Sequence, residues 1–327
     1  MMKWIQWLTG PLPEWIRADS PFVRYELAAL HRSAHRNRRR LQMVGIVGVI
    51  ILSFWAGYIV ATGFFQHEPG YNLTESLRAI LFWPVLLAQV VAQISVLLLT
   101  VSMVSEQQHR QAWDDLRGTA NGVRMSMRAR WAVVLFYRLR WPLLVIYAAR
   151  VLMILGLLYD LTAFQGHYLD LLLNGVMPTV TPVVAVLLLV LLMAAALLLP
   201  LTSLGLDAAV GLLLATRVQQ RTYSTLAQII MVLFRLALVA LIVWGATQFV
   251  AGRVQIDAGQ GWLLLAAFGA MGDWSLSFLH LSFMGSLWLV VPYSLLLGAA
   301  FLLFALAQAA LIDVVFAFAV RRAERAG

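Results

Sequence analysis

Long apolar runs with almost no charge constrain the fold of this chain more than any other feature of its sequence. A helix needs about 20 apolar residues to cross the hydrocarbon core of a bilayer. Six runs reach that length: 41–65, 80–104, 131–158, 180–216 (interrupted by Pro200), 226–250 and 287–320. Only 12% of the 327 residues are charged, whereas a soluble protein carries about 25%. We therefore predict an all-α integral membrane protein whose residues 41–320 form six transmembrane helices.

Basic residues outside these runs indicate the topology. Arginines gather in the N-terminal arm 1–40, the loop 105–130, the turn 217–221 and the tail 321–327. The segments 67–75 and 159–170 are weakly acidic instead. Because cytoplasmic loops carry an excess of Lys and Arg, we expect both termini in the cytoplasm and the chain in the cytoplasmic (inner) membrane of a prokaryote. Topology and anionic lipid headgroups then explain the net charge of +9, and we expect no binding of nucleic acid.

Two further segments are amphipathic. The Asp-Ser-Pro triplet at 19–21 combines an N-cap with proline at the first helical position, and it predicts a helix from Pro21 with Val23 and Leu27 on its apolar side. Such a helix suits the membrane interface, either as a polybasic anchor or as a docking element. The segment 251–285 is too polar to cross the membrane and too apolar for water. It predicts an outer re-entrant hairpin before the sixth span, or a long interfacial helix.

The loop 105–130 reads SEQQHRQAWDDLRGTANGVRMSMRAR and must lie outside the bilayer, because lipid cannot satisfy its charges. Residues 113–116, Trp-Asp-Asp-Leu, predict a short amphipathic helix that ends at Gly118. A helix of this kind on the cytoplasmic side favours contact with a partner protein. Trp113 would equally suit an anchor at the level of the lipid headgroups.

Together these features resemble the permease subunits of the ABC-2 exporter superfamily. The shared order is an interfacial helix, six spans, a charged helix between the second and third spans, and an outer hairpin before the sixth. In that family the loop after the second span commonly reads like S-x-E-R-E-x-G-T-W-E-L-L-x-x-T-P-L-S-x-R-E-I-x-x-G-K. Matching spacing is found at Ser105, Trp113, Asp114, Leu116, Thr119 and Arg124, with Ala129-Arg130 at the G-K position. Residues 107–109 (Gln-Gln-His) replace the E-R-E core, and Asp115 and Ala120 stand in place of an apolar residue and a proline.

The resemblance implies a mechanism in which a separate ATPase drives the permease. The cytoplasmic helix would seat in a groove of that ATPase through Trp113, Asp114, Asp115, Leu116, Arg117 and Thr119. ATP and Mg would bind to the partner, since this chain lacks a phosphate-binding loop and carries no cofactor of its own. A second permease copy or a paralogue would complete the transporter, and the unidentified substrate would be lipid-like or amphipathic. The alternative is a non-transporting membrane anchor or scaffold subunit of a larger complex, which the replaced loop residues favour.

Apart from Arg138 and Arg140 at the basic cytoplasmic end of the third span, four charges fall inside the predicted spans, where each needs a partner. Asp207 and Arg235 lie at nearly equal distances before and after the turn 217–221. On antiparallel helices their depths would differ by about one turn, roughly 6 Å, which an arginine side chain can cover. We predict an intramembrane ion pair that locks the fourth span to the fifth. For Arg150 and Asp313 we expect structural or solvated roles, with contact to an anionic headgroup as the alternative.

Chemistry other than transport finds little support in the sequence. There is no cysteine, which excludes disulfides and cysteine-bound metals. No H-E-x-x-H or G-x-S-x-G motif is present. We therefore predict no catalytic site and no metal site in this chain, and we do not expect an enzyme.

Overall fold

The computed structural model describes residues 16–17, 20–33, 73–108, 122–163, 167–217, 221–271, 275–281 and 291–325. All regular elements within these ranges are helices, and five of them are long and apolar enough to cross a membrane. These five are α4 (Leu73–Gln108), α7 (Arg140–Ala163), α9 (Pro182–Arg217), α10 (Arg221–Val250) and α13 (Leu297–Arg325). The prediction of an all-helical, multi-pass membrane protein is confirmed. The first predicted span, 41–65, lies outside the described residues.

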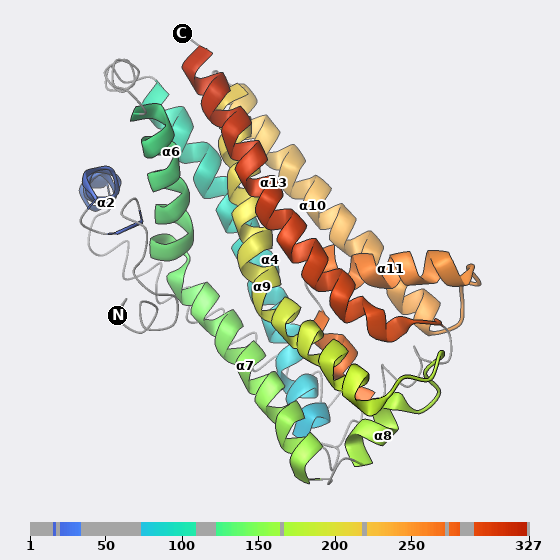
Figure 1. Cartoon of the computed structure of the whole chain (residues 1–327). Coiled ribbons are helices and arrows are strands. Elements are labelled where there is room, and N and C mark those ends of the chain that lie inside the picture. Colours follow the sequence, from blue (N-terminus) through green and yellow to red (C-terminus); the bar gives the residue numbers. More distant parts are fainter. Residues whose placement is uncertain are drawn as a thin grey trace.

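Helix α9 lies at the centre of the bundle and packs along α13, α4 and α7 (Figure 1). Small residues permit helices to approach closely in a membrane protein. Those buried on α9 include Ala195, Ala196, Gly205, Ala208, Ala209 and Gly211. At Gly211 a Cβ atom would lie only 2.0 Å from Oγ1 of Thr100 on α4, so this contact requires glycine. Helix α10 differs, because only three of its described side chains are buried, those of Ile242, Ala246 and Phe249.

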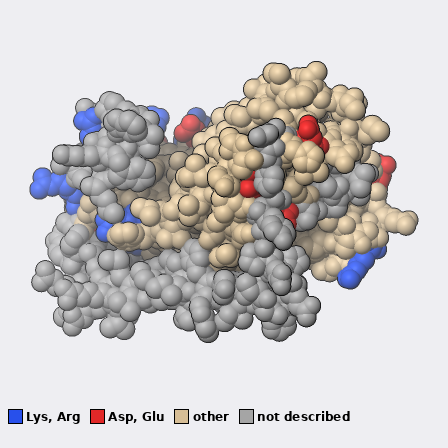
Figure 2. Space-filling model, turned by 90° about the horizontal axis from the view of Figure 1, so that it is seen from below, with Lys and Arg blue, Asp and Glu red and all other residues tan. Residues whose placement is uncertain are grey.

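The two ends of the bundle carry different elements (Figure 1) and differ in their charged residues. At one end, here named the α6 end, α2 (Pro21–Ser33) packs on α6 (Gly122–Ala132), and α13 finishes there. Its arginines include Arg124, Arg128, Arg130, Arg217, Arg321, Arg322 and Arg325. The opposite end, named the α8 end, holds α8 (His167–Leu173), the start of α4 and α11 (Ala258–Met271). Figure 2 looks from below, toward this α8 end, where charged residues are few and scattered over an uncharged surface.

The third predicted span, 131–158, is wrong as a single helix. Residues Val133–Arg138 form a π-helical turn after α6, and α7 begins only at Arg140. The cause is Pro142, because a proline lacks the N–H of the regular helix and its ring clashes with the carbonyl four residues earlier, here that of Arg138. The backbone breaks at Leu139, whose N–H instead bonds to the carbonyl oxygen of Val134 at 3.0 Å.

Other boundaries also differ from prediction. Pro200 does not interrupt α9, which continues through it. Helix α13 starts at Leu297 rather than near residue 287, because Tyr293 adopts a left-handed backbone with a φ of 59° just before it. It then continues through Arg325, so most of the predicted tail 321–327 is helical.

The predicted loops contain more helix than expected. The described parts of 105–130 are helical, because α4 reaches Gln108 and α6 starts at Gly122. The segment 251–285 contains α11 and then a 3₁₀ helix, η4 (Ser275–Leu279). The prediction that a helix begins at Pro21 is confirmed.

Candidate functional site

Helix α2 is attached to α6 through a buried ion pair. Nε of Arg130 donates to Oε1 of Glu26 at 3.0 Å, and the two side chains are only 1% and 4% exposed. Buried Val23, Ala129 and Val133 surround the contact with apolar groups. Removing one partner of a buried ion pair typically costs about 3–5 kcal/mol. We name this contact between Glu26 and Arg130 the clamp.

Two further hydrogen bonds extend the clamp into the bundle. The hydroxyl of Tyr137, in the π-helical turn, donates to the carbonyl oxygen of Ile16 at 3.0 Å. The indole N–H of Trp131 donates to the carbonyl oxygen of Gly205 on α9, also at 3.0 Å. A Cβ atom at Gly205 would lie 3.2 Å from Cζ2 of Trp131 and 2.9 Å from Cδ1 of Ile312 on α13, so the glycine permits the close approach of both α6 and α13 to α9. Helix α6 is thus tied to α2 on one side and to α9 on the other.

The backbone between α6 and α7 forms a natural bend. The π-helical turn and the break at Leu139 separate the tied helix α6 from the span α7. Turns of this kind are rare and occur frequently at functional sites. If α6 moves, residues 133–139 are where the backbone would bend, and α7 would stay helical.

The six predicted ATPase-coupling residues, Trp113, Asp114, Asp115, Leu116, Arg117 and Thr119, lie outside the described residues. Their flanks are described, since α4 ends at Gln108 and α6 starts at Gly122. The segment 109–121 therefore joins α4 to α6 at the α6 end of the bundle.

Arg150 is buried in the middle of α7, with 1% of its surface exposed. Its Nη1 donates to the carbonyl oxygen of Ala196, and its Nη2 donates to Oε1 of Gln89 at 2.9 Å. The first of these bonds has a cause in the sequence. Pro200 has no N–H to bond the carbonyl four residues earlier, which belongs to Ala196, and Arg150 supplies the missing donor. The proline that was expected to interrupt α9 is instead accommodated by an arginine from α7.

The structure brings Asp207 and Arg235 together, as the sequence predicts. Nη2 of Arg235 lies 3.7 Å from Oδ2 of Asp207, a distance that fits an ion pair but exceeds a hydrogen bond. Both side chains are mostly covered, at 15% and 19% exposure. The pair links α9 to a part of α10 whose neighbouring residues, Leu233 and Phe234, point away from the bundle at 60% and 62% exposure.

Asp313 lies apart from these groups. It is exposed on the surface of α13, and no described basic residue lies within ion-pair distance of it. Leu311 and Val314 beside it are exposed as well. The structure therefore does not join Asp313 to the predicted pair or to Arg150.

Sequence reasoning missed the clamp although a signal was present. Glu26 stands between Val23 and Leu27 on the apolar side of its helix, where a carboxylate is buried only if it is paired. No cluster of metal-binding side chains occurs in the described part of the chain. Comparison with protein-family models, with curated proteins and with solved structures finds no match to this chain.

Proposed function

We propose that this chain is the membrane permease subunit of an ATP-driven exporter whose ATPase is a separate protein. The observation that carries the proposal is the attachment of α6, the helix that follows residues 109–121, to α2 and α9. The segment 109–121 resembles the coupling loop of ABC-2 permeases, and it leads into α6, which is clamped to α2 and continues through a bend into the span α7. A force on the segment would move α2 and α6 as one body and tilt α7 at the bend.

The orientation of the chain follows from its arginines. Because cytoplasmic segments carry the excess of Lys and Arg, we propose that the α6 end faces the cytoplasm of a prokaryotic cell, with both termini on that side. Helix α2 lies at the α6 end and α4 starts at the α8 end. This placement of α2 and α4 supports including the first predicted span, 41–65, in the proposal.

A second permease copy or a paralogue is part of the proposal. Helix α10 exposes a long apolar face with Leu226, Ile230, Leu233 and Leu241. Lipid or a second permease could cover such a face, and an exporter needs a path between two permease halves. The proposed substrate is lipid-like or amphipathic. Binding of ATP and Mg belongs to the ATPase in this scheme, so the chain itself is not an enzyme.

Isolation of the tagged chain in mild detergent tests the proposal. We expect a nucleotide-binding subunit to remain bound and to hydrolyse ATP, and we expect its loss with Trp113→Ala combined with Asp115→Arg. The matched control is Tyr159→Ala combined with Asp257→Arg, which changes an exposed aromatic residue and an exposed aspartate at the α8 end. If the chain instead co-purifies with other membrane subunits and no ATPase, it is a scaffold subunit, the function that the replaced residues 107–109 favour.

A further inference from the structure

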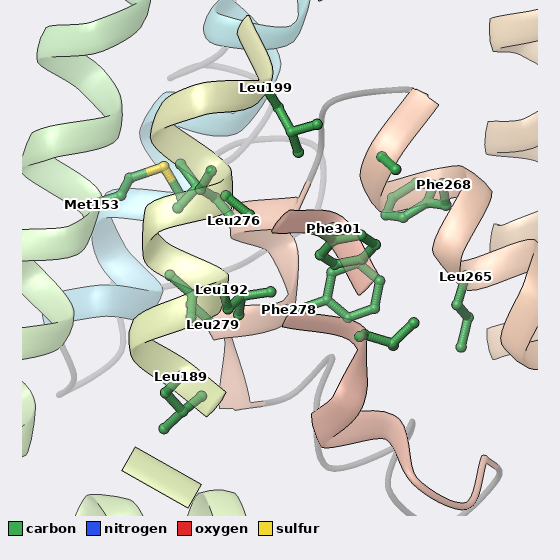
Figure 3. Packing of buried hydrophobic residues seen from close by; sticks show 14 of the residues in the cluster. Met153, Leu189, Leu192, Leu199, Leu265, Phe268, Leu276, Phe278, Leu279 and Phe301 are labelled. Atoms are coloured by element: carbon green, nitrogen blue, oxygen red, sulfur yellow. The ribbon is translucent and has the colours of Figure 1, made fainter. Parts of the chain in front are cut away.

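The 3₁₀ helix η4 is buried in the bundle near the α8 end. All five of its residues are buried, and it contacts α4, α7, α9 and α11. Figure 3 shows Phe278 lying against Phe301, with Leu279 beside Leu192 of α9. The ring centroids of Phe278 and Phe301 are 5.3 Å apart, and those of Phe278 and Phe268 are 6.1 Å apart. Irregular backbone at membrane depth requires such protein surroundings.

A small pocket lies between η4 and the buried arginine. Leu276 and Ser277 line it from η4, Gln89 lines it from α4, and Arg150 and Met153 line it from α7. Ser277 is 1% exposed, and its hydroxyl makes no hydrogen bond to any described residue. A guanidinium, an amide and an unbonded hydroxyl therefore line the same pocket under η4, among apolar side chains.

A histidine holds the end of η4 to the first turns of α4. Nη1 of Arg78 lies 3.0 Å from Nδ1 of His280, the residue that follows η4, and Nε2 of His280 lies 3.5 Å from Oε1 of Glu75. Arginine can only donate, so Nδ1 accepts and the ring proton sits on Nε2, facing the carboxylate. The guanidinium of Arg78 also lies 5.2 Å from the centroid of Phe82, which lines the pocket. We name this contact of Glu75, His280 and Arg78 the histidine bridge.

The surface to which the bridge attaches is itself fixed. Oδ1 and Oδ2 of Asp160, near the end of α7, accept hydrogen bonds from the backbone N–H groups of Leu73 at 3.1 Å and Thr74 at 2.8 Å. This caps the first turn of α4 and ties it to α7. Tyr168 of α8 is buried beside this cap, and burial raises the pKa of its phenol, which stays protonated. The start of α4 is thus fixed to α7, and the neutral ring of His280 links the end of η4 to it.

We propose that η4 is the gate at the α8 end: it covers the pocket around Arg150, and the histidine bridge holds it closed. Residues 276 and 277 meet α4 at the depth of residues 82–89, while His280 meets it at residues 75–78, so η4 and its bridge separate Arg150 from the α8 end. Opening the gate breaks contacts to a neutral imidazole and leaves Arg78 beside Glu75. A gate has a role only in a protein that transports a substrate, so this inference rests on the proposed function. It does not depend on the ATPase.

The chain has no cysteine, so a single introduced thiol reports on the gate without further changes. We would measure the maleimide labelling rate of Ser277→Cys in purified protein, with Gln255→Cys as an exposed reference at the same end. We expect Ser277→Cys to react far more slowly than the reference. Adding His280→Leu should speed its labelling by about tenfold or more, the effect of losing one hydrogen bond to a charged group. His280→Gln should leave the rate nearly unchanged, because its amide can accept from Arg78 and donate to Glu75.

A second buried thiol separates gate opening from general loosening. Ser126 of α6 is 4% exposed and lies at the other end of the bundle, so the labelling of Ser126→Cys should not respond to His280→Leu. Equal acceleration at both positions, or no acceleration at Ser277→Cys, would overturn the proposal. Fast labelling of Ser277→Cys with the bridge intact would overturn it too. None of these labelling results depends on the ATPase, so a failure of the gate can be told apart from a failure of the proposed function, which the co-purification tests.

Discussion

The two ends of the bundle use ionisable residues in opposite ways. At the α6 end, the clamp joins two charged side chains that are 1% and 4% exposed, and both belong to α-helices. At the α8 end, a neutral imidazole mediates between Glu75 and Arg78, Glu75 is 27% exposed, and the attached segment is a short 3₁₀ helix. Separating the clamp breaks a direct ion pair between two buried charged side chains, which is costly, whereas separating the histidine bridge breaks contacts to a neutral imidazole. The comparison indicates a rigid joint at one end and a contact that can open at the other.

Substitutions in the clamp should have the largest effect on stability. We expect Glu26→Gln to lower the free energy of unfolding by about 3–5 kcal/mol, because the buried Arg130 loses its ion pair with Glu26. Thermal unfolding in detergent would show this as a lowered Tm. Arg124→Met, on the exposed side of α6, is the control and should change stability by less than about 0.5 kcal/mol. If Glu26→Gln lowers the Tm only slightly, the α6 end is not held more rigidly than the α8 end.

The close contact of α4 and α9 should give the second largest effect on stability. A Cβ atom at Gly211 would lie 2.0 Å from Oγ1 of Thr100, so Gly211→Ala must push the helices apart and should cost about 1–3 kcal/mol. Gly259→Ala is the matched control, because the nearest atom to its Cβ is 3.4 Å away. The same Tm measurement checks both. If the two substitutions behave alike, the packing between α4 and α9 is looser than described.

Arg150 and Pro200 should act as a coupled pair. Arg150→Met leaves the carbonyl of Ala196 without a donor and should cost about 1–3 kcal/mol. Pro200→Ala restores the helical N–H, so in that background the same substitution should cost measurably less. A double-mutant cycle by thermal unfolding measures the difference. Strict additivity would show that Arg150 does not compensate for the proline.

The histidine bridge should have the smallest effect on stability. We expect His280→Leu to cost about 1.5 kcal/mol, the loss of one hydrogen bond to a charged group, since the apolar contacts of Phe278 remain. Its Tm shift should therefore be well below that of Glu26→Gln. Equal shifts would contradict the view that this end opens more easily.

Local sequence patterns predicted the helices well and their partners poorly. Apolar length located α4, α9 and α10, the N-cap triplet located the start at Pro21, and the spacing around the turn 217–221 predicted the contact of Asp207 with Arg235. The helix positions and the N-cap depend on residues close in the sequence, and the contact of Asp207 with Arg235 depends only on the turn 217–221 between their helices. The break before α7 was also encoded locally, in Pro142, but the apolar run concealed it.

The candidate sites depend on contacts that no local pattern contains. Glu26 and Arg130 are 104 positions apart, and Arg78 and His280 are 202 positions apart. Their pairing is decided by how α2, α4 and η4 are placed in space, which the spacing of apolar residues does not specify. The bond from Arg150 to Ala196 likewise requires knowing that α7 faces α9 at the level of Pro200.

Hydrogen–deuterium exchange of the purified chain tests the central claim most directly, because it reports local opening along the backbone. We predict slow exchange in α2 and α6 and faster exchange in residues 275–281. Glu26→Gln should accelerate exchange in α2 without affecting η4, and His280→Leu should do the reverse. Slower exchange in η4 than in α2, or acceleration of both segments by either substitution, would contradict a rigid joint at the α6 end and a gate at the α8 end.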